Sequence, residues 1–565
     1  MKIPLSKRFA FTIASLFLVV PALLYAKTNN PHRASSSKPN IIVILVDDMG
    51  YSDIGCYGGE IPTPHIDNLA SNGLRFSQFY NTARCCPTRA SLLTGLYQHQ
   101  AGIGMMTGAQ SEWVDSYQGY LNQNSQTIAE VLKTAGYHTY ITGKWHVGRT
   151  KSSMWPLQRG FDRYYGIIGG SSNYFTPKGL MLDNEELPIP NDPDYYTTDQ
   201  FTDYALKFLK EQKDDNPFFL YVAYNAPHWP LNARDEDIEK FKGKFLHGWD
   251  KLREERWKRQ VEMGLVDEKW GLSPRSEEVR AWDALSEQDQ EELDYRMAVY
   301  AAMMYRVDIN IGRIVEHLEK TKQLDNTLIL FLSDNGGCPE PWGTLTYRGH
   351  SDLGGGRIDL VNDRSLGGSG GRQGTNGSSY GEGWANASNT PFRLYKTQSH
   401  EGGISTPLVV HWPKGLKTKE GMITHAPGHI IDIMATAVDL ADASYPEVVN
   451  GQPIHPMQGK SLRKVFETGT RRPHEWLFWE HSKEGAVRTG DWKAVYRQST
   501  EEWFLYNIGK DRNELYDLST ELPEVLSVLK RKWWEWAVVN KVEPQSYSLS
   551  QKFKRTASGD DSPSH

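Results

Sequence analysis

The chain has 565 residues, of which 39% are hydrophobic and 23% are charged, so it can bury a large core and is not globally disordered. Its net charge of −6 is unsuited to general nucleic-acid binding, and no nucleic-acid partner is expected. Four cysteines without any CxxC pair exclude a disulfide scaffold and a cysteine-paired structural zinc site.

The first residues have the three parts of a secretory signal. Met1–Arg8 is basic, Phe9–Leu24 is mostly apolar, and a small residue, Ala26, ends the segment. The alternative is a membrane anchor, but an apolar stretch of about 16 residues is shorter than the roughly 20 that span a bilayer. We therefore predict a cleaved signal peptide at residues 1–26 and a disordered leader at 27–37. The mature protein is expected to be periplasmic or secreted, without a stable membrane anchor.

Five short apolar runs along the chain predict β-strands. Most are continuous rather than alternating, which is typical of strands buried on both faces of a parallel sheet. The predicted strands are Ile41–Val46, Thr139–Thr142, Phe218–Ala223, Leu328–Leu332 and Leu408–Trp412. Capping residues and terminal glycines predict intervening helices at Pro64–Asn72, at Thr127–Ala135 and from Ser286 to about Glu319. This alternation predicts an α/β protein with a large doubly wound sheet, parallel or mixed.

The rest of the chain divides by composition. Residues 38–470 form the predicted main domain. Within it, 231–285 is a charged, Trp-bearing and helical insertion, and 351–385 is a long loop rich in Gly, Ser and Asn. Residues 471–545 predict a small α+β C-terminal subdomain, and 546–565 a disordered tail. The predicted elements of the subdomain are the strands Trp476–Trp479, Trp492–Tyr496 and Trp503–Tyr506 and the helix Pro523–Val539.

Polar residues follow four of the five predicted strands. In open α/β sheets, ligands bind beyond the carboxyl ends of the strands. We therefore expect three carboxylates, an amide, a lysine and two histidines to meet at one edge of the sheet. These residues are Asp47, Asp48, Asp334, Asn335, Lys144, His146 and His228.

The acidic members of this set predict a metal site. Asp47, Asp48 and Asp334 would repel one another as bare carboxylates, and a cation would relieve the repulsion. With the Asn335 amide they form an all-oxygen set, which suits Ca²⁺ or Mg²⁺ rather than zinc. The alternative is that the Asp-Asp and Asp-Asn pairs are helix caps and turn residues.

A second cluster of reactive groups lies in the segment Cys85-Cys86-Pro87-Thr88-Arg89. Pro87 fits the first turn of a helix and Gly95 fits its end. Cys85 would then precede a helix N-terminus, where the dipole favours anions, with Arg89 one turn along the same face. A nucleophile, a dipole and a guanidinium would thus be aimed at one point. The alternative is that Cys85 is a small buried hydrophobe.

Together these motifs resemble, in the same order, the signature blocks of type I sulfatases, which belong to the alkaline phosphatase superfamily. The resemblance spans residues 41 to about 412, and the C-terminal subdomain looks most like that of bacterial arylsulfatases. The blocks are Asp47-Asp48-Met49-Gly50, Cys85-x-Pro87-x-Arg89 with Leu92-x-Thr94-Gly95, Gly143-Lys144-Trp145-His146, Ala226-Pro227-His228, Ser333-Asp334-Asn335-Gly336-Gly337 and Lys396 with Glu401-Gly402-Gly403.

The resemblance implies an alkaline-phosphatase-like fold, hydrolysis of sulfate esters of a small molecule or a glycan, and a modified cysteine. Cys85 is then oxidised to formylglycine (3-oxoalanine) by a maturation enzyme that reads the CxPxR segment before folding. One Ca²⁺ is held by Asp47, Asp48, Asp334 and Asn335. The residues implied to surround the sulfate are Arg89, Lys144, His146, His228 and Lys396.

The implied mechanism uses the hydrated aldehyde, a geminal diol. One hydroxyl attacks sulfur, and loss of the proton from the other expels sulfate and restores the aldehyde. By resemblance, His146 assists the second step, and His228 with Lys396 protonates or stabilises the leaving oxygen. Two alternatives stay open: a phosphodiester or phosphonate monoester hydrolase on the same scaffold, and a non-catalytic binder of sulfated glycans. A disulfide between Cys56 and Cys338 is also left open.

Overall fold

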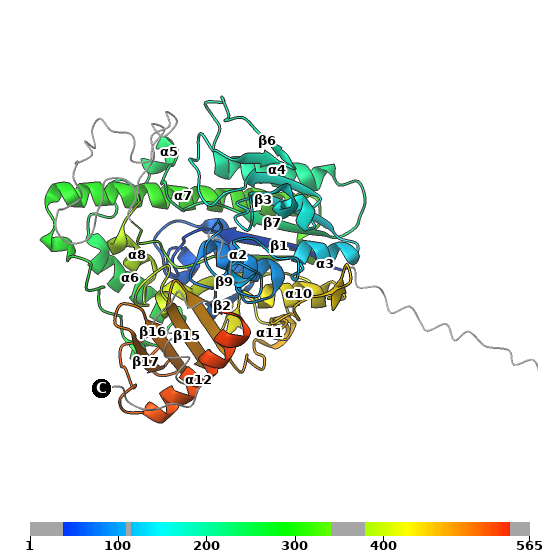
Figure 1. The fold of residues 1–565 in the computed structure, drawn as a ribbon. Coiled ribbons are helices and arrows are strands. Elements are labelled where there is room, and N and C mark those ends of the chain that lie inside the picture. The colour runs from blue at the N-terminus through cyan, green and yellow to red at the C-terminus, as the bar shows by residue number, and fades with distance from the viewer. Residues whose placement is uncertain (1–37, 109–114, 341–378, 543–565) are drawn as a thin grey trace, which may run out of the picture. The chain divides into compact units, whose positions relative to one another are not determined.

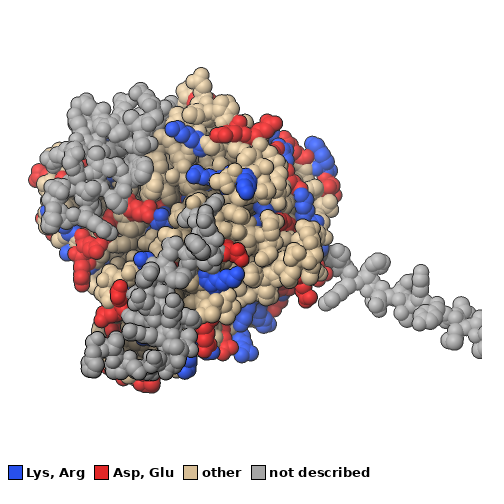
Figure 2. Space-filling model, viewed as in Figure 1, with Lys and Arg blue, Asp and Glu red and all other residues tan. Residues whose placement is uncertain are grey.

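The computed structural model describes residues 38–108, 115–340, 379–542. The predicted signal peptide, leader and tail lie outside these residues, as does 351–378 of the predicted loop. Among the described helices, none is both long and apolar enough to cross a bilayer. On the face seen in Figure 2, acidic and basic side chains are interspersed.

The described residues form an 11-stranded mixed sheet with a parallel centre. The strand order is β10-β2-β9-β8-β1-β7-β3-β4-β5-β6, and β11 pairs with β2. All five predicted strands are present, as β1, β3, β7, β8 and β9. The strands are β1 (Asn40–Val46), β2 (Leu74–Tyr80), β3 (His138–Gly143), β4 (Arg163–Ile167), β5 (Leu180–Leu182), β6 (Glu185–Glu186), β7 (Phe218–Ala223), β8 (Thr327–Ser333), β9 (Ser405–His411), β10 (Met422–Thr424) and β11 (Gly428–His429).

Helices cover both faces of this sheet, as the continuous apolar runs predict. Alternate residues of β1 belong to two different cores: Ile42 and Ile44 pack with α1, α4 and α7, whereas Ile41 and Val43 pack with α2, α3 and α10. Figure 1 shows the same division, with α4 and α7 on one side of β1. The helices are α1 (Pro64–Ser71), α2 (Cys85–Thr94), α3 (Ile128–Thr134), α4 (Thr197–Glu211), α7 (Glu287–Lys320) and α10 (Asp432–Leu440).

The predicted insertion is partly helical and packs on the core. It contains α5 (Asp235–Ile238) and α6 (Gly248–Glu262). The prediction of a loop through residue 385 is wrong at its end, because α8 (Glu382–Ser388) is a buried helix. The Trp384 ring lies 5.5 Å from that of Trp249 and 5.4 Å from that of Trp282, and this aromatic packing outweighs the local glycine content. Shorter elements of the main sheet region are α9 (Glu401–Ile404), α11 (Arg463–Thr468), β12 (Val448–Val449) and β13 (Gln452–Pro453).

The C-terminal part is a four-stranded antiparallel sheet with one helix. Three strands and the helix were predicted, and the additional strand is β15. The elements are β14 (Leu477–His481), β15 (Glu484–Thr489), β16 (Trp492–Arg497), β17 (Glu502–Asn507) and α12 (Pro523–Val539). The α/β fold with a β-rich C-terminal subdomain is therefore confirmed.

Glu484, at the start of β15, makes stability depend on pH. Its Oε1 accepts the backbone N–H of Gln498 at 3.1 Å, whereas its buried Oε2 has no hydrogen-bond partner among the described residues. Burial raises the pKa of Glu484 from 4.5 to about 7. The folded carboxyl holds its proton more tightly than the unfolded one. The stability that it contributes is therefore complete below about pH 4.5 and is lost as the pH rises through 7.

Replacing Glu484 with glutamine should remove this loss, because the amide keeps an acceptor for Gln498 and never ionises. We expect the free energy of unfolding of Glu484→Gln to exceed that of the wild type by about 1–3 kcal/mol at pH 8 and to differ little at pH 4.5. Denaturant unfolding at both pH values measures this difference. The exposed Glu502 of the same sheet provides the control, Glu502→Gln, and equal pH profiles for Glu484→Gln and wild type would contradict the expectation.

Candidate active site

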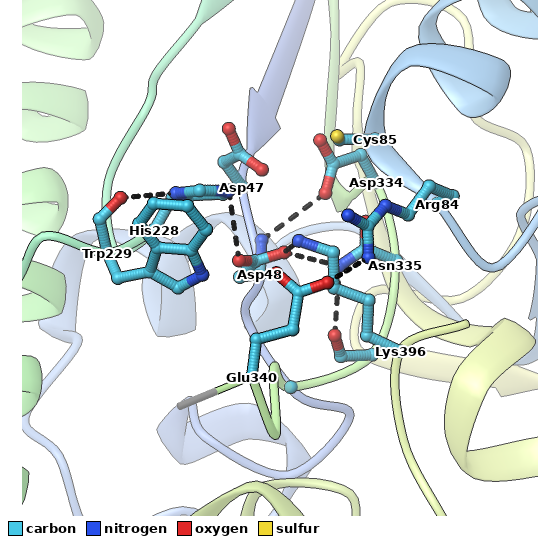
Figure 3. A network of polar contacts seen from close by, with 12 residues as sticks. Asp47, Asp48, Arg84, Cys85, His228, Trp229, Asp334, Asn335, Glu340 and Lys396 are labelled. Carbon is cyan, nitrogen blue, oxygen red and sulfur yellow. Dashed lines mark hydrogen bonds and ion pairs between the residues drawn. The ribbon is translucent and has the colours of Figure 1, made fainter. Parts of the chain in front are cut away.

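Strand register brings the predicted acidic residues together. Val46 of β1 pairs with Ser333 of β8, so Asp47 and Asp334 leave adjacent parallel strands side by side. The Asp334 N–H donates to Val46 O at 3.1 Å, which holds the two strand ends in line. Asp48 has φ of +70°, a left-handed backbone conformation that turns the chain sharply after β1. In Figure 3 the side chains of Asp48 and Asn335 lie next to one another at this edge.

The four predicted metal ligands are buried and offer oxygen atoms. Asn335 Nδ2 donates to Asp48 Oδ1 at 2.6 Å, and the Asp48 N–H lies 3.3 Å from Asp334 Oδ1. Asp47 Oδ1, Asp48 Oδ2 and Asn335 Oδ1 are buried acceptors with no hydrogen-bond partner among the described residues. Such orphaned oxygens are costly unless something binds them. The donor set therefore fits a hard divalent cation.

Three basic side chains surround the carboxylates. Lys144 Nζ donates to Asp47 Oδ2 at 2.5 Å, and Arg89 Nη2 donates to Asp334 Oδ2 at 2.7 Å. Both pairs are fully buried. Even so, burial and the charge of Asp47 raise the pKa of Asp334 well above its usual value. A bound cation would relieve this crowding of the Asp47 and Asp334 carboxylates.

Lys396, the last of the predicted site residues in chain order, also lies beside these carboxylates. Its Nζ donates to Asp48 Oδ1 at 2.6 Å, and both groups are buried. Its backbone N–H donates to Gly337 O at 3.1 Å, which fixes its loop against the turn after β8. Burial opposes ionisation of Asp48, but the charges of Lys396 and His228 outweigh it and hold the pKa of Asp48 well below its usual value.

Cys85 faces the basic cluster from the start of α2. The helix begins at Cys85 itself, with Arg84 as its N-cap, one residue earlier than predicted. Cys85 Sγ lies 3.6 Å from His146 Nδ1. A hydrogen bond with Cys86, together with the charges of Lys144, His146 and Lys396, holds the pKa of the Cys85 thiol well below its usual value, despite burial. Low thiol pKa at a helix N-terminus is typical of reactive cysteines.

Cys86, the next residue, has a different environment from Cys85. Its Sγ lies 3.5 Å from Met105 O and 3.6 Å from Met106 Sδ and packs with an apolar core, although it also lies within 4.8 Å of Cys85 Sγ. Burial raises its pKa well above the usual value. Of the two adjacent thiols, Cys85 is therefore the one whose pKa is low. All four cysteines are free, so the disulfide considered for Cys56 and Cys338 is not present.

The two predicted histidines are buried, His146 beside Cys85 and His228 beside Asp48. Burial and the charge of Lys144 lower the pKa of His146 to about 4, so it is neutral near pH 7. His228 Nδ1 lies 2.5 Å from Trp229 O. A carbonyl only accepts, so Nδ1 carries the proton and Nε2 faces Asp48 Oδ2 at 3.5 Å (Figure 3).

Three residues near the site were missed by sequence reasoning. Arg84, which precedes Cys85, forms an ion pair with Glu340. His481, at the end of β14, is close enough to Arg84 and Cys85 for their charges to act on it, and burial lowers its pKa to about 3. The position of Arg84 beside the cysteine was a usable signal. Nothing in the sequence pointed to Glu340 or His481, because only tertiary contacts bring these two residues to the site.

Comparisons with known proteins agree with this geometry. The family model described as Sulfatase matches residues 39–443, and that described as N-sulphoglucosamine sulphohydrolase, C-terminal, matches 393–537. An uncharacterized sulfatase of Schizosaccharomyces pombe is 32% identical, over 89% of this chain and 94% of its own length. The arylsulfatase of Klebsiella aerogenes is 34% identical, over 77% of this chain and 93% of its own length.

Solved structures also match most of this chain. The crystal structure of Ps i-CgsB has a TM-score of 0.63 at 28% identity, and the match covers 88% of this chain and 93% of that one. The phosphonate monoester hydrolase of Agrobacterium radiobacter shares the fold at a TM-score of 0.53 and 18% identity, over 89% of this chain and 96% of that one. The family model and the two relatives cover most of the chain, and the protein therefore belongs to the sulfatase family and is a sulfuric ester hydrolase.

Proposed function

We propose that the protein hydrolyses sulfate monoesters with Cys85, converted to formylglycine, as the nucleophilic residue and with one Ca²⁺ held by Asp47, Asp48, Asp334 and Asn335. The observation that carries the proposal is the contrast between two adjacent thiols. A hydrogen bond with Cys86 and the charges of Lys144 and His146 hold the pKa of Cys85 well below its usual value, whereas burial raises the pKa of Cys86. A maturation enzyme acting on the CxPxR segment is the implied partner.

The proposed cofactors supply two kinds of chemistry: the ion supplies positive charge to sulfate oxygens, and formylglycine supplies a hydroxyl nucleophile at position 85. The chain's own residues do the rest. Arg89 and Lys144 bind the oxygens of the sulfate that carry negative charge. Neutral His146, whose Nδ1 lies 3.6 Å from Cys85 Sγ, accepts a proton from the group at position 85.

His228 and Lys396 act on the leaving group in this proposal. His228 Nε2 is the nitrogen that faces the site, because Nδ1 is held by Trp229 O. Lys396 Nζ, buried beside Asp48, keeps its proton, since the charge of Asp48 outweighs the effect of burial and raises the pKa of Lys396 well above its usual value. Lys396 can therefore place a proton or positive charge near the departing oxygen, whereas Nε2 of His228, which carries no proton while Nδ1 does, must first take up a proton to act in the same way.

The proposed substrate class is an aryl or carbohydrate sulfate. The N-acetylgalactosamine-6-sulfatase of Homo sapiens is 27% identical over 87% of this chain, and one structure of Ps i-CgsB holds k-i-k-neocarrahexaose. These relatives favour a sulfated glycan. We also propose the domain boundaries given above and export of the protein, on the basis of its N-terminal sequence.

The modification is tested by the intact mass of the peptide that contains Cys85, from protein produced with and without a formylglycine-generating enzyme. An aldehyde at residue 85, with Cys86 unchanged, is the expected result. A thiol at residue 85 in protein that hydrolyses nitrophenyl sulfate would contradict the proposal. Turnover of bis(nitrophenyl) phosphate in the same samples tests the phosphodiesterase alternative.

Removing the metal should abolish most activity and also lower stability. Without the ion, Asp47 Oδ1, Asp48 Oδ2 and Asn335 Oδ1 have no hydrogen-bond partner among the described residues, and the crowded carboxylates repel one another. We expect dialysis against a chelator to lower kcat/KM by at least about 100-fold and to lower the melting temperature, and Ca²⁺ to restore both. Asp334→Ala should not recover with Ca²⁺. Full activity after exhaustive chelation, with no metal by elemental analysis, would contradict the metal proposal.

A further inference from the structure

A cavity of about 430 Å³ has no role in the reaction described above. Three separate parts of the chain form its walls. The predicted insertion contributes residues 274–278, the loop around Lys396 contributes Arg393, Thr397 and Gln398, and the C-terminal sheet contributes Glu484 and Arg497. These are surface segments on a rigid scaffold, the arrangement that binding sites commonly use.

The cavity adjoins the reacting centre. Glu340 is part of its lining and forms an ion pair with Arg84, the residue directly before Cys85 (Figure 3). On another wall, Thr397 directly follows Lys396, whose Nζ lies 2.6 Å from Asp48. A group bound in the cavity is therefore next to the sulfate site and can belong to the same substrate molecule.

Two guanidinium groups in the lining are not neutralised. Among the described residues, neither Arg393 nor Arg497 forms an ion pair with a carboxylate. Arg393 Nη1 donates only to a backbone oxygen, that of Glu514, at 3.0 Å. Arg497 is half-buried and its buried Nε has no hydrogen-bond partner. Partly buried and unpaired arginines attract anions strongly, because a guanidinium matches sulfate and carboxylate geometry.

The lining also holds five glutamates. Glu340 is paired with Arg84, Glu382 accepts the Tyr395 hydroxyl, and Glu484 is close enough to Arg497 for the charge of Arg497 to act on it. Glu277 and Glu278 are exposed on the wall formed by the insertion. The cavity thus offers both unpaired guanidinium groups and carboxylate acceptors, which suits a sugar that has both an anionic substituent and hydroxyl donors.

We propose that this cavity is a subsite for a second anionic group, a sulfate or a carboxylate, on the sugar next to the one whose sulfate is hydrolysed. Arg497 is its principal contact and determines specificity. The proposal rests on the glycan substrate class proposed above. It goes beyond that class because it states that a doubly anionic disaccharide is preferred over a singly anionic one.

The test measures how sulfated disaccharides inhibit hydrolysis of nitrophenyl sulfate. The probes are disaccharides from carrageenan and chondroitin sulfate with one or two anionic groups. For the wild type, the inhibition constant of the best doubly anionic disaccharide should be about 10–100-fold lower than that of its singly anionic counterpart, since hydrogen bonds to charged groups are strong. In Arg497→Gln, the ratio of these two inhibition constants should be at least about 10-fold smaller than in the wild type. In Arg497→Lys, the ratio should lie between those of the wild type and Arg497→Gln.

The preference is the ratio of two inhibition constants measured on the same variant. A general loss of activity affects both constants alike and therefore does not change the ratio. Arg463, which pairs with Asp439 on the surface of α11, provides the matched control, and Arg463→Gln should keep the wild-type ratio. The proposal is overturned if the wild type has no preference, if Arg497→Gln keeps it, or if that variant loses all turnover. Failure of the wild type to hydrolyse nitrophenyl sulfate or any sulfated probe would instead overturn the proposed function.

Discussion

Replacing Cys85 with alanine should lower kcat/KM for nitrophenyl sulfate by about 10⁵-fold or more while the protein stays folded. Loss of a covalent nucleophile has effects of this size in other hydrolases. The fold should tolerate the change because Cys85 is a small residue in the first turn of α2, and alanine is a good helix former there. Steady-state kinetics and thermal unfolding measure the two effects.

The control is its neighbour, Cys86→Ala. Cys86 Sγ contacts Met105 and Met106, and burial raises its pKa well above the usual value, so it is a poorer nucleophile than Cys85. This variant should lose some stability, about 1 kcal/mol, but keep substantial activity. If Cys86→Ala were inactive and Cys85→Ala active, the assignment of the nucleophilic residue would be wrong.

The largest expected effect on stability comes from Lys493 of β16. This buried lysine donates to Glu401 Oε1 at 2.9 Å and lies 2.8 Å from Glu514 Oε1. Glu401 also accepts from Arg512 at 3.1 Å and from the Tyr80 hydroxyl at 3.0 Å. Although burial acts in the opposite direction, the charges of Lys493 and Arg512 lower the pKa of Glu401 to about 2. A fully buried ionic network therefore joins the C-terminal sheet to the main sheet.

Lys493→Met should lower the free energy of unfolding by about 3–5 kcal/mol, because it leaves Glu401 and Glu514 as close buried acids with too little positive charge. Denaturant unfolding followed by circular dichroism measures the loss. The control is Lys464→Met, which removes an exposed lysine 3.4 Å from Glu467 and should cost less than about 1 kcal/mol. Equal losses for the two variants would show that the network does not hold the subdomain in place.

Sequence reasoning succeeded where one local pattern decides the structure. β1, β7 and β8 are continuous apolar runs buried on both faces, and their polar end residues follow directly. It missed β2, whose sequence LRFSQFY mixes polar and apolar residues because it carries side chains into contacts with several different elements. Lys396 followed from the family resemblance, yet its burial beside Asp48 depends on a loop that no periodicity describes. Glu340 and Arg497 could not be predicted, because only the packed structure gives them a common cavity.

The pairing of β1 with β8 also bears on how the protein is made. Asp48 meets Asp334 across 286 residues and Lys396 across 348, so no contiguous segment contains the site. Contacts this distant form late, because a long stretch of chain must be ordered before they close. Under the proposed function, a chain still being synthesised is inactive until the loop around Lys396 has emerged and docked. Return of enzymatic activity during refolding therefore reports the last stage of assembly, after the helices and individual strands have formed.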